Sequence, residues 1–166
     1  SGFDLDERRC GEFERAGGRV VSSARDVATE SLVLLSLPTS DVVETVLNDV
    51  GDDLSRGTIV VDTTTGRPND AVRTASMLAA RGVRYLDATV GGSSQQARDG
   101  DAIIICGGDV VAFENCRQLF AAVSRETFHV GASGSGARMK LVVNLVLGLN
   151  RAVLAEGLAF AAQTGL

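Results

Sequence analysis

Short apolar segments alternate with amphipathic segments along most of the chain. Apolar runs without polar alternation predict strands that are buried on both faces, and they occur at 32–37 and 58–62. Further strands are expected at 83–87 and 102–106. Shorter strands are expected at 19–21 and 127–130. Helices are expected at 7–16, 40–48, 68–81 and 111–123, each bounded by Ser, Asp, Pro or Gly signals. This alternation predicts an α/β fold with an open, mostly parallel sheet and helices on both faces.

The pattern changes after residue 134, where one long apolar helix is expected over about 135–164. Lys140 and Asn144 are four residues apart, which puts them on one face of that helix, one turn from each other. Their neighbours are almost all aliphatic, so both polar side chains should be partly desolvated. A buried ammonium group is costly unless a partner or a reaction uses it. Lys140 is therefore the first candidate for chemistry.

Composition narrows the range of functions. The 166 residues are 45% hydrophobic and 22% charged, which is an ordinary balance for one globular domain with a core. A net charge of −5 argues against a nucleic-acid partner, because phosphate binding requires a basic surface. No uninterrupted apolar run approaches the ~20 residues of a membrane span, and no export leader is visible. The three cysteines lack metal-type spacing and are expected to be reduced, so we expect a cytoplasmic protein without a metal site.

Ligands of open parallel sheets bind beyond the carboxyl ends of the strands. An acidic residue at such an end, here Asp4, suits the ribose hydroxyls of a dinucleotide and would repel a ribose phosphate. The alternative is that Asp4 only caps a helix. A G-x-G-x-x-G phosphate turn should precede this acid by about twenty residues, and the chain begins too late to include one. The G-x-G at 134–136 continues into a long helix and is interpreted as a hinge.

Lys140 suits the role of a general acid, because an ammonium can protonate the alkoxide that forms when hydride reduces a carbonyl. Partial burial would lower its pKa and allow transfer in both directions. The alternative is a lysine that extends from an amphipathic helix into solvent. Asn144 could orient a substrate or be satisfied by a neighbouring loop. The loop at Gly91, Gly92 and Ser93 could bind a carboxylate through N–H and hydroxyl groups, or be a plain connection. His129 is interpreted as structural, and no hydrolytic triad is expected.

Several of these segments, taken in order, resemble the β-hydroxyacid dehydrogenase family, which includes 3-hydroxyisobutyrate dehydrogenase, tartronate semialdehyde reductase and, more remotely, 6-phosphogluconate dehydrogenase. The resemblance covers essentially the whole chain. It rests on Phe3-Asp4, Leu37-Pro38-Thr39-Ser40, Asp62-Thr63-Thr64-Thr65 with Pro68, Asp87-Ala88-Thr89-Val90-Gly91-Gly92, Gly107-Gly108, and Gly134-x-Gly136-x-x-x-Lys140-x-x-x-Asn144.

The resemblance implies a Rossmann-type NAD(P)-binding domain at 1–134 and a long inter-domain helix at 135–166. An all-helical C-terminal domain that builds a dimer would follow. Lys140 matches the family's catalytic lysine, and Asn144 matches its substrate-binding asparagine. Asp4 falls where NAD-preferring members keep an acid, so NAD is favoured over NADP. Leu37, Pro38 and Thr65 match positions that line the cofactor. The family's substrate-carboxylate loop aligns with Gly91, Gly92 and Ser93.

Three positions depart from the family's Asp-Ala-Pro-Val-Ser-Gly-Gly segment: Thr89 replaces the proline, Gly91 the serine and Ser93 the last glycine. The substrate is therefore open within the class of small 3-hydroxy acids. The first strand, the phosphate turn and nearly all of the C-terminal domain are expected to lie outside this chain, which we expect to be inactive alone. The leading hypothesis is an NAD(P)-dependent 3-hydroxyacid dehydrogenase that forms homo-oligomers. The alternatives are a non-enzymatic cofactor-sensing or oligomerisation module and an imine reductase on the same fold.

Overall fold

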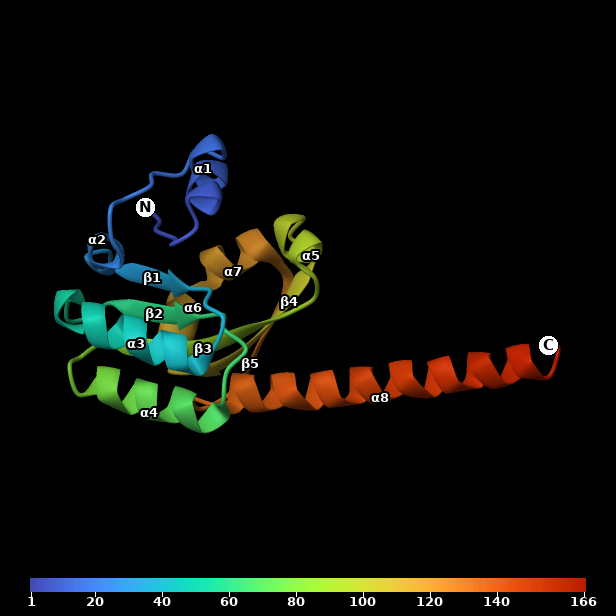
Figure 1. Ribbon diagram of the computed structural model, residues 1–166. Helices are drawn as coiled ribbons and strands as arrows, with labels where there is room; N and C mark the ends of the chain where they lie inside the picture. The colour runs from blue at the N-terminus through green and yellow to red at the C-terminus, as the bar shows by residue number, and fades with distance from the viewer.

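The computed structural model describes all 166 residues and contains one five-stranded sheet with helices on both faces (Figure 1). The strands follow one another across the sheet in chain order. Three neighbouring pairs are parallel, and only β3 and β4 are antiparallel. The mostly parallel α/β sheet is thereby confirmed. The strands are β1 (Leu32–Leu35), β2 (Ile59–Asp62), β3 (Arg84–Gly91), β4 (Ala102–Gly108) and β5 (Ser124–Gly131).

Most helices begin at a side chain that accepts a free N–H of the first turn, as at Asp6, Ser23, Thr39, Ser93 and Asp109. The single helix expected at 111–123 is instead two helices that meet at Cys116. The helices are α1 (Glu7–Arg15), α2 (Ala24–Ala28), α3 (Ser40–Val50), the 3-10 turn η1 (Gly51–Asp53), α4 (Pro68–Ala79), α5 (Ser94–Arg98), α6 (Val110–Asn115), α7 (Arg117–Val123) and α8 (Ser135–Gln163).

Two apolar clusters form the core, one on each face of the sheet. The first packs α2, α3 and α4 against β1, β2 and β3. The second packs α6 and α7 against β2, β3 and β4. Alternation along β2 divides its side chains between them, with Val60 in the first cluster and Val61 in the second. Along β3, Tyr85 belongs to the first cluster and Leu86 to the second, which puts Asp87 and Thr89 on the face of Tyr85.

β1 corrects the expectation of a strand that is buried on both faces. Val33 and Leu35 are buried, whereas Leu32 and Leu34 are 39% and 49% exposed. β1 is an edge strand that pairs only with β2, and α2 and α3 cover only one of its faces. An unbroken apolar run therefore does not by itself establish that both faces are covered.

α8 projects away from the sheet as a single long helix (Figure 1). Among its residues only Gly136 and Ala137 are buried. An 18-residue window of α8 has a mean hydropathy of 1.5 and none of it is buried, so by length and composition this helix could cross a membrane. This criterion is a mean over a window, whereas the expectation from the sequence concerned an uninterrupted apolar run, and polar residues such as Asn144 and Arg151 interrupt α8. Core helices of soluble proteins satisfy the same criterion.

Candidate active site

A chain of hydrogen bonds joins the carboxyl ends of β1 and β2 to Tyr85, the second residue of β3. The Leu37 N–H donates to Thr64 Oγ1 at 3.1 Å, and the Thr64 N–H donates to Asp62 Oδ1 at 2.9 Å. The Tyr85 hydroxyl donates to Asp62 Oδ2 at 2.7 Å. Asp62 thus fixes both loops that were expected to line a cofactor, those at Leu37-Pro38 and at Thr65. Leu37 is half-buried, whereas Pro38 and Thr65 are exposed at this edge.

Asp62 and Tyr85 are both buried and interact directly. Burial raises the pKa of Asp62 above its usual range, and the hydrogen bonds from Thr64 and Tyr85 oppose that shift. Burial also raises the pKa of Tyr85, and the neighbouring Asp62 charge adds to the effect. Beside this pair lies a cavity of about 10 Å³, room for roughly one water molecule, whose lining includes Asp62, Tyr85, Asp87 and Ala137.

Asp4 lies between the isolated parallel bridge of Gly2 with Val20 and the start of α1, and it is partly exposed. Its Oδ1 accepts the N–H of Asp6 at 2.9 Å, and its Oδ2 lies 3.7 Å from Arg9. The N-cap of α1 is Asp6, whose carboxylate accepts the N–H of Arg8. Asp4 is therefore not the N-cap of α1, although its side chain accepts the N–H of the residue that is. The carboxylate that remains accessible at Asp4 has the chemistry to bind two ribose hydroxyls.

The segment at Gly91, Gly92 and Ser93 is more ordered than a flexible loop. Gly91 ends β3 and pairs with Ile103 of β4. Ser93 is the N-cap of α5 and forms a capping box: its Oγ accepts the N–H of Gln96 at 3.2 Å, and its N–H donates to the Gln96 amide at 2.9 Å. The backbone N–H of Ser93 is therefore already occupied. Its hydroxyl proton remains free to donate to a ligand.

The first turn of α8 is held by Asp87. Asp87 Oδ1 accepts the N–H of Gly134 at 2.8 Å, and Oδ2 accepts the N–H of Ala137 at 2.9 Å. Burial raises the pKa of Asp87, while the N–H groups of Ala137 and Gly134 oppose that shift. These contacts fix the part of α8 from which Lys140 extends.

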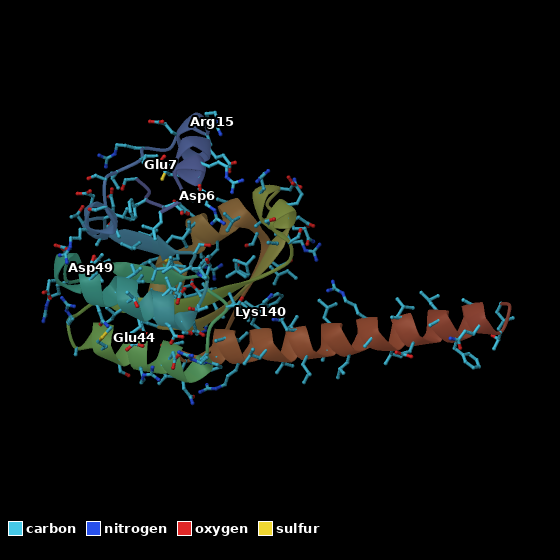
Figure 2. All side chains as sticks on the ribbon, in the orientation of Figure 1. Asp6, Glu7, Arg15, Glu44, Asp49 and Lys140 are labelled. Atoms are coloured by element: carbon cyan, nitrogen blue, oxygen red, sulfur yellow. The ribbon has the colours of Figure 1, made fainter.

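Lys140 lies near the start of α8, beside the sheet rather than on the projecting part of the helix (Figure 2). The side chain is half-buried, and burial lowers its pKa. The thirteen ion pairs of the structure do not include it. Asn144, one turn later, is exposed, so the expected desolvation holds for the lysine and not for the asparagine. No hydrogen bond joins either residue to the Gly91–Ser93 segment.

Two further features of the sequence bear on this site. Lys140 is the only lysine among 166 residues, although the chain carries 16 basic residues in total. The Ser93-x-x-Gln96 spacing is a capping-box signature and indicates a helix start rather than an open loop. The role of Asp87 had no such signal, because its partners lie 47 and 50 residues away. His129 Nε2 lies 2.9 Å from the Gly108 carbonyl, in agreement with a structural use.

Comparison with known proteins gives consistent results. Residues 1–131 match the family described as the NAD binding domain of 6-phosphogluconate dehydrogenase. The chain is 34% identical to 2-(hydroxymethyl)glutarate dehydrogenase of Eubacterium barkeri, over 99% of this chain and 56% of that protein. It is also 34% identical to the cytokine-like nuclear factor N-PAC of Aedes aegypti, over 95% of this chain and 29% of that protein. The chain thus spans little more than half the length of one relative and less than a third of the other.

Solved structures agree with the fold. The 3-hydroxyisobutyrate dehydrogenase of Mycobacterium tuberculosis, determined with L-serine, superimposes with a TM-score of 0.94 at 28% identity. That match covers 99% of this chain and 57% of the other. An imine reductase of Streptomyces aurantiacus superimposes with a TM-score of 0.90 at 19% identity, over 99% of this chain and 58% of the other. The second likeness shows only that the two proteins share the fold.

Proposed function

Because the chain belongs to the family of the NAD-binding domain of 6-phosphogluconate dehydrogenase, we propose that it forms the cofactor domain and catalytic helix of an NAD(P)-dependent dehydrogenase. The substrate class is a small 3-hydroxy acid and its semialdehyde. The observation that carries this proposal is the position of Lys140, a half-buried amine without an ion-pair partner at the root of α8. The relatives from Eubacterium barkeri and Mycobacterium tuberculosis are named as hydroxyacid dehydrogenases, which supports the same class of reaction.

Lys140 acts as the acid–base group in this proposal. NAD(P), when bound, accepts or supplies the hydride. In oxidation the neutral amine takes the proton of the substrate hydroxyl, and in reduction the ammonium returns it to the developing alkoxide. Burial lowers the pKa of Lys140, which is the direction that an acid–base role requires. Asn144 on the same helical face orients the substrate through its amide.

The cofactor proposal rests on Asp4, Leu37, Pro38 and Thr65. The partly exposed Asp4 carboxylate binds the ribose hydroxyls and disfavours a ribose phosphate, so NAD is preferred over NADP. The cofactor lies along the edge of the sheet whose loops Asp62 fixes through hydrogen bonds, next to Leu37, Pro38 and Thr65. In the full-length protein, Asp4→Asn should weaken the preference for NAD⁺ when KM is compared for both cofactors. An unchanged preference would remove Asp4 from the proposal.

The substrate carboxylate is proposed to bind at Gly91, Gly92 and Ser93. The capping box leaves the Ser93 hydroxyl and the Gly92 N–H as the donors of this segment. A panel of 3-hydroxy acids assayed with the full-length protein tests the function as a whole. Lys140→Ala should reduce kcat by about 10²–10⁴-fold, while the KM for the cofactor stays near its wild-type value. Turnover that survives Lys140→Ala would contradict the acid–base role.

A second candidate function is a non-enzymatic module that senses cofactor or mediates oligomerisation. The altered segment at Thr89, Gly91 and Ser93 and the likeness to a protein named as a nuclear factor favour it. The lone lysine at the root of α8 favours the enzyme, since a scaffold has no use for a desolvated amine. Absence of turnover with every substrate of the panel would favour the module. Imine reduction is the third option, and the resemblance places another residue at the lysine position in those enzymes.

Assembly and location complete the proposal. Twelve large apolar side chains of α8 are exposed, among them Val142, Leu145 and Leu154, and we propose that they form a homo-oligomer interface. The isolated chain should then associate with itself, and a strictly monomeric mass in light scattering at high concentration would count against this. The three free cysteines support a reducing, cytoplasmic location. The division into a domain at 1–134 and an inter-domain helix at 135–166 is likewise proposed.

A further inference from the structure

The first turn of α8 has no capping side chain of its own. Its N-cap residue is Gly134, with φ +86°, a conformation that favours glycine. Ala137 is the third helical residue, whose N–H an N-cap side chain ordinarily accepts. Here Asp87 of β3 accepts that N–H and the N–H of Gly134 as well. A strand residue, 3% exposed, therefore caps the helix from outside.

Thr89 makes a second contact to the same turn. Residues two apart on a strand point to the same face, so Thr89 lies on the side of β3 that carries Asp87. Thr89 is fully buried, and its Oγ1 lies 3.2 Å from the Ile105 carbonyl and 3.4 Å from the Gly136 carbonyl. In an α-helix the Gly136 carbonyl accepts the N–H of Lys140. The Thr89 hydroxyl thus contacts the same carbonyl that accepts the hydrogen bond from the Lys140 N–H.

α8 approaches the sheet closely because a glycine lies on each side of the contact, Gly136 on α8 and Gly107 on β4. A Cβ on Gly136 would lie 2.2 Å from the Asp87 carbonyl oxygen, and a Cβ on Gly107 would lie 2.8 Å from the backbone nitrogen of Gly136. The helix therefore rests directly on the backbones of β3 and β4. Such a contact leaves α8 little freedom to slide or rotate at its root.

We propose that Asp87 and Thr89 are positioning residues that set the height and rotation of the α8 turn carrying Lys140. The inference rests on the proposed function, in which Lys140 is the acid–base group. Thr89 is of particular interest because the family segment that this strand resembles has proline there, and proline has neither a hydroxyl nor an N–H to offer. The arrangement in this chain thus adds a polar contact at the base of the catalytic helix.

The contacts of Asp87 and Thr89 with the first turn of α8, called here the clamp, act on Lys140 through one turn of the helix. This short distance is the reason to infer a functional role and not only a structural one. Lys140 is four residues beyond Gly136, and burial alone lowers its pKa. No ion pair would hold the amine in place if the turn moved. A shift of the turn would therefore expose the amine to water and displace it from its reaction partner, and displacements of about 1 Å cost roughly 10²-fold in rate.

The test uses Thr89→Val, which keeps the shape and removes the hydroxyl, and Thr89→Ser, which restores it. Because Lys140 is the only lysine, lysine isotope-labelled at Cε gives one side-chain NMR signal in this chain, and its pKa can be titrated directly. We expect Thr89→Val to raise that pKa toward the ordinary lysine value and Thr89→Ser to restore it. In the full-length protein kcat should fall roughly 10- to 100-fold, with the cofactor KM changed less than about twofold.

Thr58→Val is the matched control, because Thr58 is another buried threonine whose hydroxyl meets only the Glu30 carbonyl, at 3.5 Å. It should change stability without changing the pKa of Lys140 or kcat. Asp87→Asn provides a second variant should Thr89→Val fold poorly. An unchanged pKa of Lys140 in a folded Thr89→Val or Asp87→Asn variant overturns the inference. A shifted pKa with unchanged kcat supports the clamp and refutes the acid–base role of Lys140 instead.

Discussion

Replacement of Gly136 by alanine is the most direct perturbation of the contact between α8 and the sheet. The added Cβ would lie 2.2 Å from the Asp87 carbonyl oxygen, 2.8 Å from the Ile105 carbonyl oxygen and 2.9 Å from the Gly107 nitrogen. All three are backbone atoms of paired strands, so none can rotate away. The helix must therefore withdraw by about 1 Å to restore ordinary van der Waals separation.

The free-energy cost follows from the hydrogen bonds that this withdrawal breaks. The two bonds to Asp87, now 2.8 and 2.9 Å, would lengthen beyond hydrogen-bonding range. Each bond to a charged group contributes about 1.5–3 kcal/mol, and alanine regains up to about 1 kcal/mol over glycine within a helix. The free energy of unfolding should therefore fall by about 2–5 kcal/mol.

Urea unfolding of the chain, followed by circular dichroism, measures this change. Gly148→Ala is the matched control, because it makes the same substitution in the same helix at a position with nothing within 4 Å of the new Cβ. The control should leave the unfolding free energy at the wild-type value or raise it by up to about 1 kcal/mol. A Gly136→Ala chain as stable as the Gly148→Ala chain would refute the close packing of α8 on β3.

Burial raises the pKa of Asp62 above its ordinary value of 3.8. Above about pH 4 the folded chain therefore holds more protons at this site than the unfolded chain. As a result, the free energy of unfolding falls as pH rises through the pKa of the folded chain. Asp62→Asn should flatten that fall in urea unfolding between about pH 4 and 8; an unchanged slope would contradict it. Tyr85→Phe removes the hydroxyl that lies 2.7 Å from Asp62 and should cost about 1.5–3 kcal/mol, and less than that when Asp62 is already Asn. Equal costs in both backgrounds would show that the two side chains are not coupled. Burial raises the pKa of Cys106 to about 12 and raises that of Cys116, so a thiol-reactive dye should label the half-buried Cys10 in the native chain and the other two only after unfolding. Rapid native labelling of all three would disprove this.

Hydrophobic periodicity located most of the fold, because buried strands such as 59–62 and 102–108 carry unbroken apolar residues. The pattern could not reveal that one face of β1 is uncovered, since exposed Leu34 looks the same as a buried leucine in sequence. The antiparallel β3–β4 pair also needed the structure. A hint was available, because the residues between Gly91 and Ala102 are too few for the usual crossover between parallel strands.

The candidate site was predictable where a residue type was unusual for its surroundings. Lys140 was identified from an amine within an aliphatic helix, and the structure finds it half-buried. Asn144 followed from the same helical spacing, but spacing carries no information about what covers a helix, and the residue is exposed. Asp87 was noted only as a strand end. Its partners are backbone N–H groups of a distant turn, and backbone groups are present at nearly every position, so no residue type marks them.

α8 is fixed to the sheet only at its N-terminal end, so the rest of the helix can act as a lever. Its 29 residues span about 44 Å at 1.5 Å per residue, and only the first turn is gripped by the sheet. A tilt of about 5° at that grip would swing the region of Phe160 by several ångströms over this length. A force on the projecting part of α8, in turn, acts on the first turn of the helix, where Asp87 accepts two backbone N–H groups. A molecule that binds the projecting part of α8 would thereby act mechanically on the turn that carries Lys140.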